Sequence, residues 1–335
     1  MTTTFRLLDL PHIAQLHVFK SFTLFQLSLI SFCSLKTKKL VESLCLTAVI
    51  RPLISGRYNN TLMIDKRPDF LIEYGLIEDV SGSNLTSSTL TSIHSKGYLP
   101  YDGQTAVVWI PGKVLLFEHL VKHLMEIFHQ KGMDVILTTQ AALTVESVVK
   151  TIGKFNLGKI NCETLSEELM KLIPPPKQIS ICSTQEGQNE KWLSEVYVQN
   201  YDSLSVNRLV KVSFEDVLIM NAQSIRVEFG PIFEKQLNLF VKLWMKGSFP
   251  RLEYISLDRQ HFGATLFDKV KVLKGVKHTE NPEEEERIFN RSFKYWNFEY
   301  TEICKGGWDI RGKNGKNATI VLSSKYSDFE MFVWP

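Results

Sequence analysis

The sequence predicts a mixed α/β protein, α+β overall, in which three short helices precede a larger strand–helix domain that ends in a small antiparallel meander. Three observations predict this fold. Apolar residues recur at helical spacing in residues 13–45, strand and helix patterns alternate over about residues 113–260, and a hairpin signal lies at about residues 290–335. Because 335 residues exceed what one core usually needs, we expect two domains, residues 1–46 and 47–335.

The N-terminal helices are predicted from apolar spacing. Leu10 precedes Pro11, which disfavours a helical backbone at Leu10 and places the first helix after it. The periodic segments are Ile13–Phe19, Leu24–Phe32 and Lys36–Cys45. Three helices this short cannot bury all of their apolar side chains against one another. We therefore expect the block to bury its remaining apolar face against another surface.

Residues 46–112 are richer in strand and turn signals. The β-prone segments are Leu46–Ile50, Thr61–Ile64, Phe70–Tyr74 and Thr105–Ile110. Residues 81–92 are rich in Ser and Thr, which predicts an exposed loop.

From residue 113 onward, helices and strands alternate. The helix expected at Val114–Gln130 carries one apolar stripe, made of Leu116, Leu120, Leu124 and Ile127. The later helices are expected at 144–154, Thr164–Ile173, Phe214–Asn221 and Phe233–Met245. The strands between them are expected at Asp134–Thr138, Leu157–Cys162, Gln178–Cys182, Leu209–Val212, Ser224–Glu228 and Leu252–Leu257. Each unit is too small to bury its own apolar face, so we expect a repeat-like parallel sheet of stacked units.

Two helix starts carry capping signals. Thr164 with Glu167 fits a capping box, and Ser213 with Asp216 is a looser version of it. The three prolines at 174–176 end the helix before them.

The C-terminal meander is predicted from its turn. Asn314-Gly315 separates the strands Trp308–Arg311 and Asn317–Leu322, and both central turn positions are expected to have positive φ. Phe329–Trp334 supplies a third strand. The acidic run Glu283–Glu286 before the meander is expected to be a solvated helix face.

Bulk composition excludes several functional classes. The net charge is only +3, with 39 Lys and Arg against 36 Asp and Glu, so no strong footprint for nucleic acid or an anionic membrane exists. Five cysteines without a CxxC predict neither a disulfide framework nor a zinc knuckle. Without a targeting segment or a span of membrane length, we expect a cytoplasmic or nuclear protein.

Catalytic signatures are missing from the sequence. No Gly-rich phosphate loop and no G-x-S-x-G elbow occurs, so we expect a non-catalytic protein without cofactor or metal. His119 and His123 lie four residues apart on one helix, a spacing that could hold a metal, but the glutamate of the zincin motif is absent. Both are interpreted as boundary histidines on an amphipathic helix.

Residues 5–41 nevertheless resemble the F-box, in the form found in the expanded nematode set. The matching positions are Phe5, Leu7-Leu8, Leu10-Pro11, Val18, Phe25, Leu27, Ser31 and Ser34 to Lys38. The C-terminal part resembles the type-2 F-box-associated region of that set. Its matches are Leu237 to Phe240, Lys242 to Trp244, Pro250 to Glu253, Asp309 to Arg311, Asn317 to Ile320 and Phe329 to Trp334.

This resemblance implies a substrate-recognition adaptor of a cullin-type (SCF) ubiquitin ligase. The helical block would bind a Skp-family linker protein and through it a cullin, and the second domain would bind a protein target. The implied linker contacts, or supports of those contacts, are Leu10, Pro11, Val18, Phe22, Leu27 and Ile30. The alternative is a non-catalytic protein-interaction module without ubiquitin-ligase assembly. Neither interpretation identifies the target.

Overall fold

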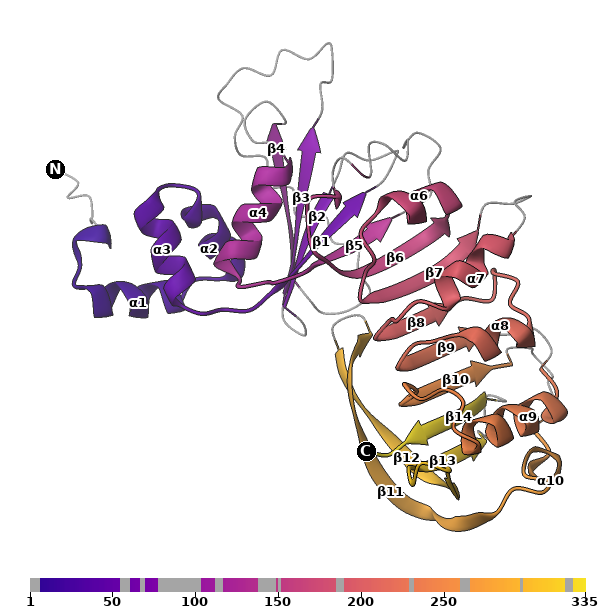
Figure 1. The fold of residues 1–335 in the computed structure, drawn as a ribbon. Helices are drawn as coiled ribbons and strands as arrows, with labels where there is room; N and C mark the ends of the chain where they lie inside the picture. Colours follow the sequence, from indigo (N-terminus) through magenta and orange to yellow (C-terminus); the bar gives the residue numbers. More distant parts are fainter. Residues whose placement is uncertain are drawn as a thin grey trace. The chain divides into compact units, whose positions relative to one another are not determined.

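The computed structural model describes residues 7–54, 61–66, 70–77, 104–111, 117–137, 149, 152–184, 190–228, 232–259, 266–295, 298–322 and 328–335. The chain divides into two compact units, Met1–Gly158 and Lys159–Pro335 (Figure 1). Both contain helices and strands, so the predicted mixed α/β fold is confirmed.

The first unit begins with a short helical block. It comprises η1 (Leu7–Asp9), α1 (His12–Lys20), α2 (Leu24–Ser31) and α3 (Leu35–Ser43). Reciprocal capping bonds fix two of the helix starts: Thr23 pairs with Gln26 before α2, and Ser34 pairs with Thr37 before α3. Because each cap satisfies backbone N–H groups that the helix leaves open, the chain changes direction sharply between the helices.

A mixed sheet and a fourth helix complete the first unit. The sheet comprises β1 (Val49–Ile54), β2 (Thr61–Lys66), β3 (Phe70–Ile77), β4 (Gln104–Pro111) and β5 (Met133–Leu137), in the order β5-β1-β2-β3-β4. Helix α4 (Phe117–Ile127) buries Leu120, Leu124 and Ile127, as its predicted stripe requires. Leu116, the predicted 81–92 loop and most of the predicted 144–154 helix lie outside the described residues.

The second unit is built on a parallel sheet that continues into the antiparallel meander. The parallel strands are β6 (Leu157–Leu165), β7 (Gln178–Thr184), β8 (Ser203–Val206), β9 (Ser224–Glu228) and β10 (Tyr254–Asp258). The antiparallel strands follow in the order β14 (Asp328–Val333), β13 (Asn317–Leu322), β12 (Phe298–Arg311) and β11 (His278–Tyr295). Successive strand–helix repeats of the second unit therefore lie side by side, as the repeat-like pattern predicted.

Short helices connect the parallel strands. They are α6 (Glu167–Leu172), η2 (Glu190–Trp192), α7 (Leu193–Tyr197), α8 (Phe214–Ile219), α9 (Glu234–Met245) and α10 (Lys269–Val272). Figure 1 shows α6 to α9 along one side of the strands. Ser213 caps α8 through Asp216, as predicted. The apolar stripe of α9 is buried, and Phe240 on it meets Phe329 of β14 edge to face at 6.3 Å.

Two predicted element boundaries were wrong. Residues 209–212 form no strand; the strand at this point is β8, before them. Asn207 explains the difference, because its side chain accepts a bond from the Leu209 N–H at 3.3 Å and its carbonyl one from the Val210 N–H at 3.0 Å, which closes a turn. The capping residue of α6 is Ser166, since Thr164 still belongs to β6.

The meander also departs from its prediction in two details. The acidic run Glu283–Glu286 is solvated but lies in strand β11, where a register shift separates Asn281 from Glu286 and Lys305 pairs with Glu286 at 3.1 Å. In the hairpin, only Gly315 has a positive φ, of 82°. The loop spans residues 312–316 between the paired Arg311 and Asn317, so it is longer than a two-residue turn and needs only one left-handed position.

Candidate functional site

The helical block keeps part of its apolar surface exposed. Its interior consists of Phe19, Leu24, Leu27, Leu40 and Val41, which are all buried. In contrast, Ile13 is 72% exposed and Leu35 is 79% exposed, far more than large apolar side chains usually are in a folded domain. The described part of the chain therefore leaves an apolar surface on these helices.

The two most exposed side chains sit at neighbouring helix starts. The Leu8 carbonyl accepts a bond from the Gln15 amide of α1 at 2.9 Å and another from the Lys36 ammonium of α3 at 2.9 Å. These bonds hold the first turns of α1 and α3 together, and Ile13 and Leu35 belong to those turns. The starts of α1 and α3, which carry Ile13 and Leu35, thus lie next to each other.

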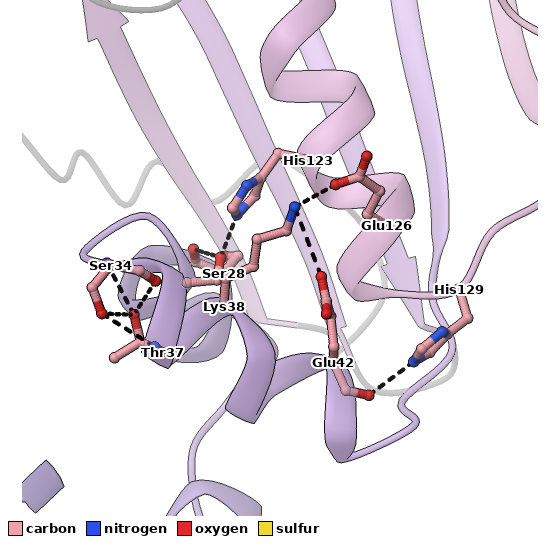
Figure 2. A network of polar contacts seen from close by, with 9 residues as sticks. Ser28, Ser34, Thr37, Lys38, Glu42, His123, Glu126 and His129 are labelled. Atoms are coloured by element: carbon pink, nitrogen blue, oxygen red, sulfur yellow. Dashed lines mark hydrogen bonds and ion pairs between the residues drawn. The ribbon is translucent and has the colours of Figure 1, made fainter.

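Helix α4 covers another side of the block, as Figure 2 shows. The His123 ring stacks on the Phe32 ring with 4.1 Å between centroids, and its Nε2 lies 2.8 Å from the Ser31 hydroxyl. Lys38 of α3 forms ion pairs with Glu126 of α4 and, at 3.7 Å, with Glu42. The first unit thus covers the α2–α3 side of the block itself.

A further contact ties the end of α3 to the segment after α4. The His129 Nε2 lies 2.9 Å from the Glu42 carbonyl (Figure 2). The Gln130 side chain then accepts a bond from the Ile50 N–H at 2.5 Å, at the start of β1. The helical block is consequently anchored to the sheet of the first unit by side-chain bonds at several points.

The environment of His123 keeps its imidazole neutral. Burial, and secondarily the positive charge of Lys38, lower the pKa of His123 from 6.5 to about 4, although Glu126 acts in the opposite direction. The Lys38 ammonium also donates a hydrogen bond to the Glu126 carboxyl, and this bond lowers the pKa of that carboxyl. His123 therefore acts as a packing residue and hydrogen-bond partner at neutral pH, as a boundary histidine should.

This pKa predicts an acid sensitivity of the first unit. Between pH 4 and 6.5 the unfolded chain binds more protons at His123 than the folded chain, so this stabilisation is complete above pH 6.5 and is lost as the pH falls toward 4. In His123→Phe, which keeps a ring against Phe32, the loss on acidification should shrink by on the order of 1 kcal/mol. Urea denaturation at neutral and mildly acidic pH measures it. His119→Phe, on the exposed side of the same helix, should keep the wild-type slope; an equal change there would contradict the assignment to His123.

The six predicted linker residues occupy different environments. Pro11 is exposed; Leu10, Val18, Phe22 and Ile30 are partly buried; and Leu27 is buried in the interior at 1% exposure. The Phe22 ring stacks on the Phe19 ring at 5.4 Å, so it supports the core as well as the surface.

Sequence reasoning missed Ile13 and Leu35 as surface residues. Helical geometry could have found Leu35, because it lies about 200° around α3 from the buried Thr37 at 100° per residue. The apolar spacing of α1 could not identify Ile13 as a surface residue, because that spacing places Ile13 on the apolar stripe expected to face inward.

No metal-binding or membrane-spanning feature appears in the part of the chain that the structure describes. None of the helices described there is long and apolar enough to cross a bilayer. No group of three or more His, Cys, Asp or Glu side chains in the described ranges is arranged to hold a metal ion.

The match to a family model falls within the second unit. Residues 192–257, from the end of η2 to β10, match the family model described as F-box associated. The F-box associated domain-containing protein sdz-33 of Caenorhabditis elegans is 22% identical over 237 residues, which cover 65% of this chain and 72% of that protein. No solved structure matches the chain. The similarity to nematode F-box-associated proteins is therefore confirmed.

Proposed function

We propose that this chain is a non-catalytic substrate-recognition adaptor of a cullin-type ubiquitin ligase. In this proposal, residues 1–46 form an F-box that binds a Skp-family linker protein, and the rest of the chain binds a protein target in the cytoplasm or nucleus. The observation that carries it is the exposed apolar end of the helical block, in a chain whose residues 192–257 match the F-box associated family.

The packing of the helical block supports a protein partner at one end. Its α2–α3 side is covered by α4, and among the described residues of the block only Ile13 and Leu35 are large apolar side chains more than 70% exposed. Burying such side chains in an interface gains about 25 cal/mol per Å² of apolar surface removed from water. An exposed apolar surface of this kind is typical of a protein-binding site.

An adaptor of this kind needs no reacting groups of its own. It raises the rate of ubiquitin transfer by holding the target near the enzyme that carries ubiquitin, which is an effect of proximity. The second unit suits the target-binding part, because stacked strand–helix units expose long rows of side chains.

Truncation of two contact residues tests the proposal. Leu10→Ala combined with Pro11→Ala should lower retention of a Skp-family linker protein about tenfold, because both side chains lie at the start of α1 near the exposed end. A pull-down by the full chain measures it. Leu209→Ala, which truncates a 68% exposed leucine of the second unit, is the control and should bind like the wild type. If the wild-type chain retains no linker protein, the adaptor proposal fails and an interaction module without ligase assembly replaces it.

A further inference from the structure

The parallel sheet of the second unit has one apolar and one polar face. Side chains alternate between the faces along each strand, and register partners on adjacent strands share a face. One row crosses the sheet on the apolar face and is fully buried: Cys162, Ile181, Val206, Val227, Leu257 and Phe329. Since Phe329 packs on Phe240 of α9, this is the face that the helices cover (Figure 1).

The opposite face, here called the polar face, carries a different row. Its members are Asn161, Ser180, Ser205, Arg226, Ser256 and Glu330. None of the described helices of the second unit lies along it in Figure 1. Ser180 and Ser256 of this row are buried, and the other four side chains are partly exposed. Parallel sheets of ordinary α/β proteins are covered on both faces, so helices on one face alone are typical of stacked-repeat proteins that bind partners on the other face.

The antiparallel hairpin β11–β12 limits the open area. Phe289 of this hairpin packs against Tyr254 at 6.3 Å and Phe332 at 5.3 Å, and both lie on the polar face one row before Ser256 and Glu330. The hairpin thus covers the start of β10. Among the described residues, the part of the face that the hairpin does not cover lies toward the carboxyl ends of the parallel strands.

Carboxylates dominate that open part. Asp258 of β10 pairs in register with Glu228 of β9 and with Asp328 of β14, and Glu330 lies two residues beyond Asp328 on the same face. These four acidic side chains share the face with Arg226, the one basic side chain in these two rows from β9 to β14. All five are partly exposed to solvent.

The carboxylates are close enough to disturb one another. Burial raises the pKa of Asp328 to about 7; a hydrogen bond that protonated Asp328 donates to the Asp258 carboxylate and the charges of Asp258 and Glu330 add to it, while Arg226 lowers it. The Tyr254 hydroxyl donates to Glu330, which fixes that carboxylate in place. A cation placed over this group would relieve the repulsion and would drive a proton off Asp328.

We propose that the polar face, at the carboxyl ends of β9, β10 and β14, binds a Lys- or Arg-rich segment of a protein target. The sign of the charge selects the partner: phosphates of nucleic acids and anionic lipids are repelled, and acidic segments likewise. The inference rests on the proposed target-binding role, and it adds the chemistry of the target and the surface that holds it.

A labelled peptide that alternates Lys and Ser serves as the probe, with a Glu–Ser peptide of the same length as its counterpart. Fluorescence anisotropy with the full chain should show binding of the basic peptide alone. Asp258→Asn combined with Asp328→Asn should weaken it about tenfold, since both isosteric changes remove charge without removing volume. Arg226→Gln should tighten it severalfold, and a gain of affinity cannot arise from misfolding.

The acidic run of β11 provides the matched control. Glu283→Gln with Glu284→Gln also removes two negative charges, but from exposed positions in another part of the unit, and should leave peptide affinity unchanged. Equal weakening by both pairs, or no effect of the Asp258 and Asp328 pair, overturns the assignment.

Proton release supplies a second readout. Because peptide binding favours ionised Asp328, affinity should rise from about pH 6 to about pH 8 in the wild type and stay flat in the Asp328→Asn variant. The groups that face Asp328, namely Asp258, Glu228, Glu330 and Arg226, remain in place in that variant. Retention of the linker protein is measured on the same preparations, so peptide binding without linker retention rejects the adaptor role alone, and the reverse rejects the polar face alone.

Discussion

Ile13→Asp combined with Leu35→Asp is expected to abolish linker retention, with a loss of affinity of about 100-fold or more, while the helices stay folded. Both side chains are more than 70% exposed, so their replacement removes little packing within the chain. In a complex, however, the same positions would place two carboxylates in a desolvated apolar interface without partners, which is strongly unfavourable. Far-UV circular dichroism checks the fold, and a pull-down with the linker protein measures the binding.

The control for this experiment carries the same chemistry elsewhere. Val198→Asp combined with Leu209→Asp introduces two carboxylates at apolar positions of the second unit that are 47% and 68% exposed. That variant should retain the linker protein like the wild type. Unchanged retention by the Ile13 and Leu35 variant would show that the exposed end of the helical block is not the docking surface, and the adaptor proposal would lose its main support.

The elements that could be predicted are those whose signal is local. Helix α9 was placed to within one residue because Leu237, Phe240, Val241 and Trp244 recur at helical spacing and are all buried. The start of α8 followed from Ser213 and Asp216, whose reciprocal bonds involve residues only three positions apart. In these cases the residues that decide the structure are neighbours in the sequence.

The errors arise where a more distant or competing interaction decides. Glu283–Glu286 has the composition of a solvated helix, but it lies within strand β11, where Asn281 before it and Glu286 at its end pair with Gly307 and Lys305 of β12. Thr164 fits a capping box, yet pairing with Ser183 of β7 extends β6 past it, and the cap falls to Ser166. Charge and capping patterns alone cannot report such tertiary pairing.

The candidate site shows the same division. The sequence identified the helical block as a surface, but it could not separate Leu27, which is interior, from Pro11, which is exposed. The decisive information is the docking of α4, where His123 reaches Ser31 across 92 positions of sequence. That contact, with the Phe32–His123 stacking and the Lys38–Glu126 ion pair, shows which side of the block is covered by the chain itself.

Phe240→Ala is expected to lower the free energy of unfolding of the second unit by about 3–5 kcal/mol, the range found for large aromatic side chains removed from a core. Phe240 is fully buried on α9, and its ring lies 4.8 Å from the Phe249 ring and 6.3 Å from the Phe329 ring. Truncation would therefore open a cavity between the helix and β14, the strand on which the acidic Asp328 is carried. Urea denaturation followed by tryptophan fluorescence measures the change.

Leu239→Ala is the matched control, because Leu239 is the preceding residue of the same helix and is 47% exposed. It should change the free energy of unfolding by less than about 0.5 kcal/mol. A similar loss in both variants would mean that burial of Phe240 against β14 does not determine the effect, because helix propensity favours Ala at both positions. A large loss confined to Phe240→Ala would instead show that α9 supports the sheet and its polar face. In that case Leu239→Ala should retain the linker protein like the wild type.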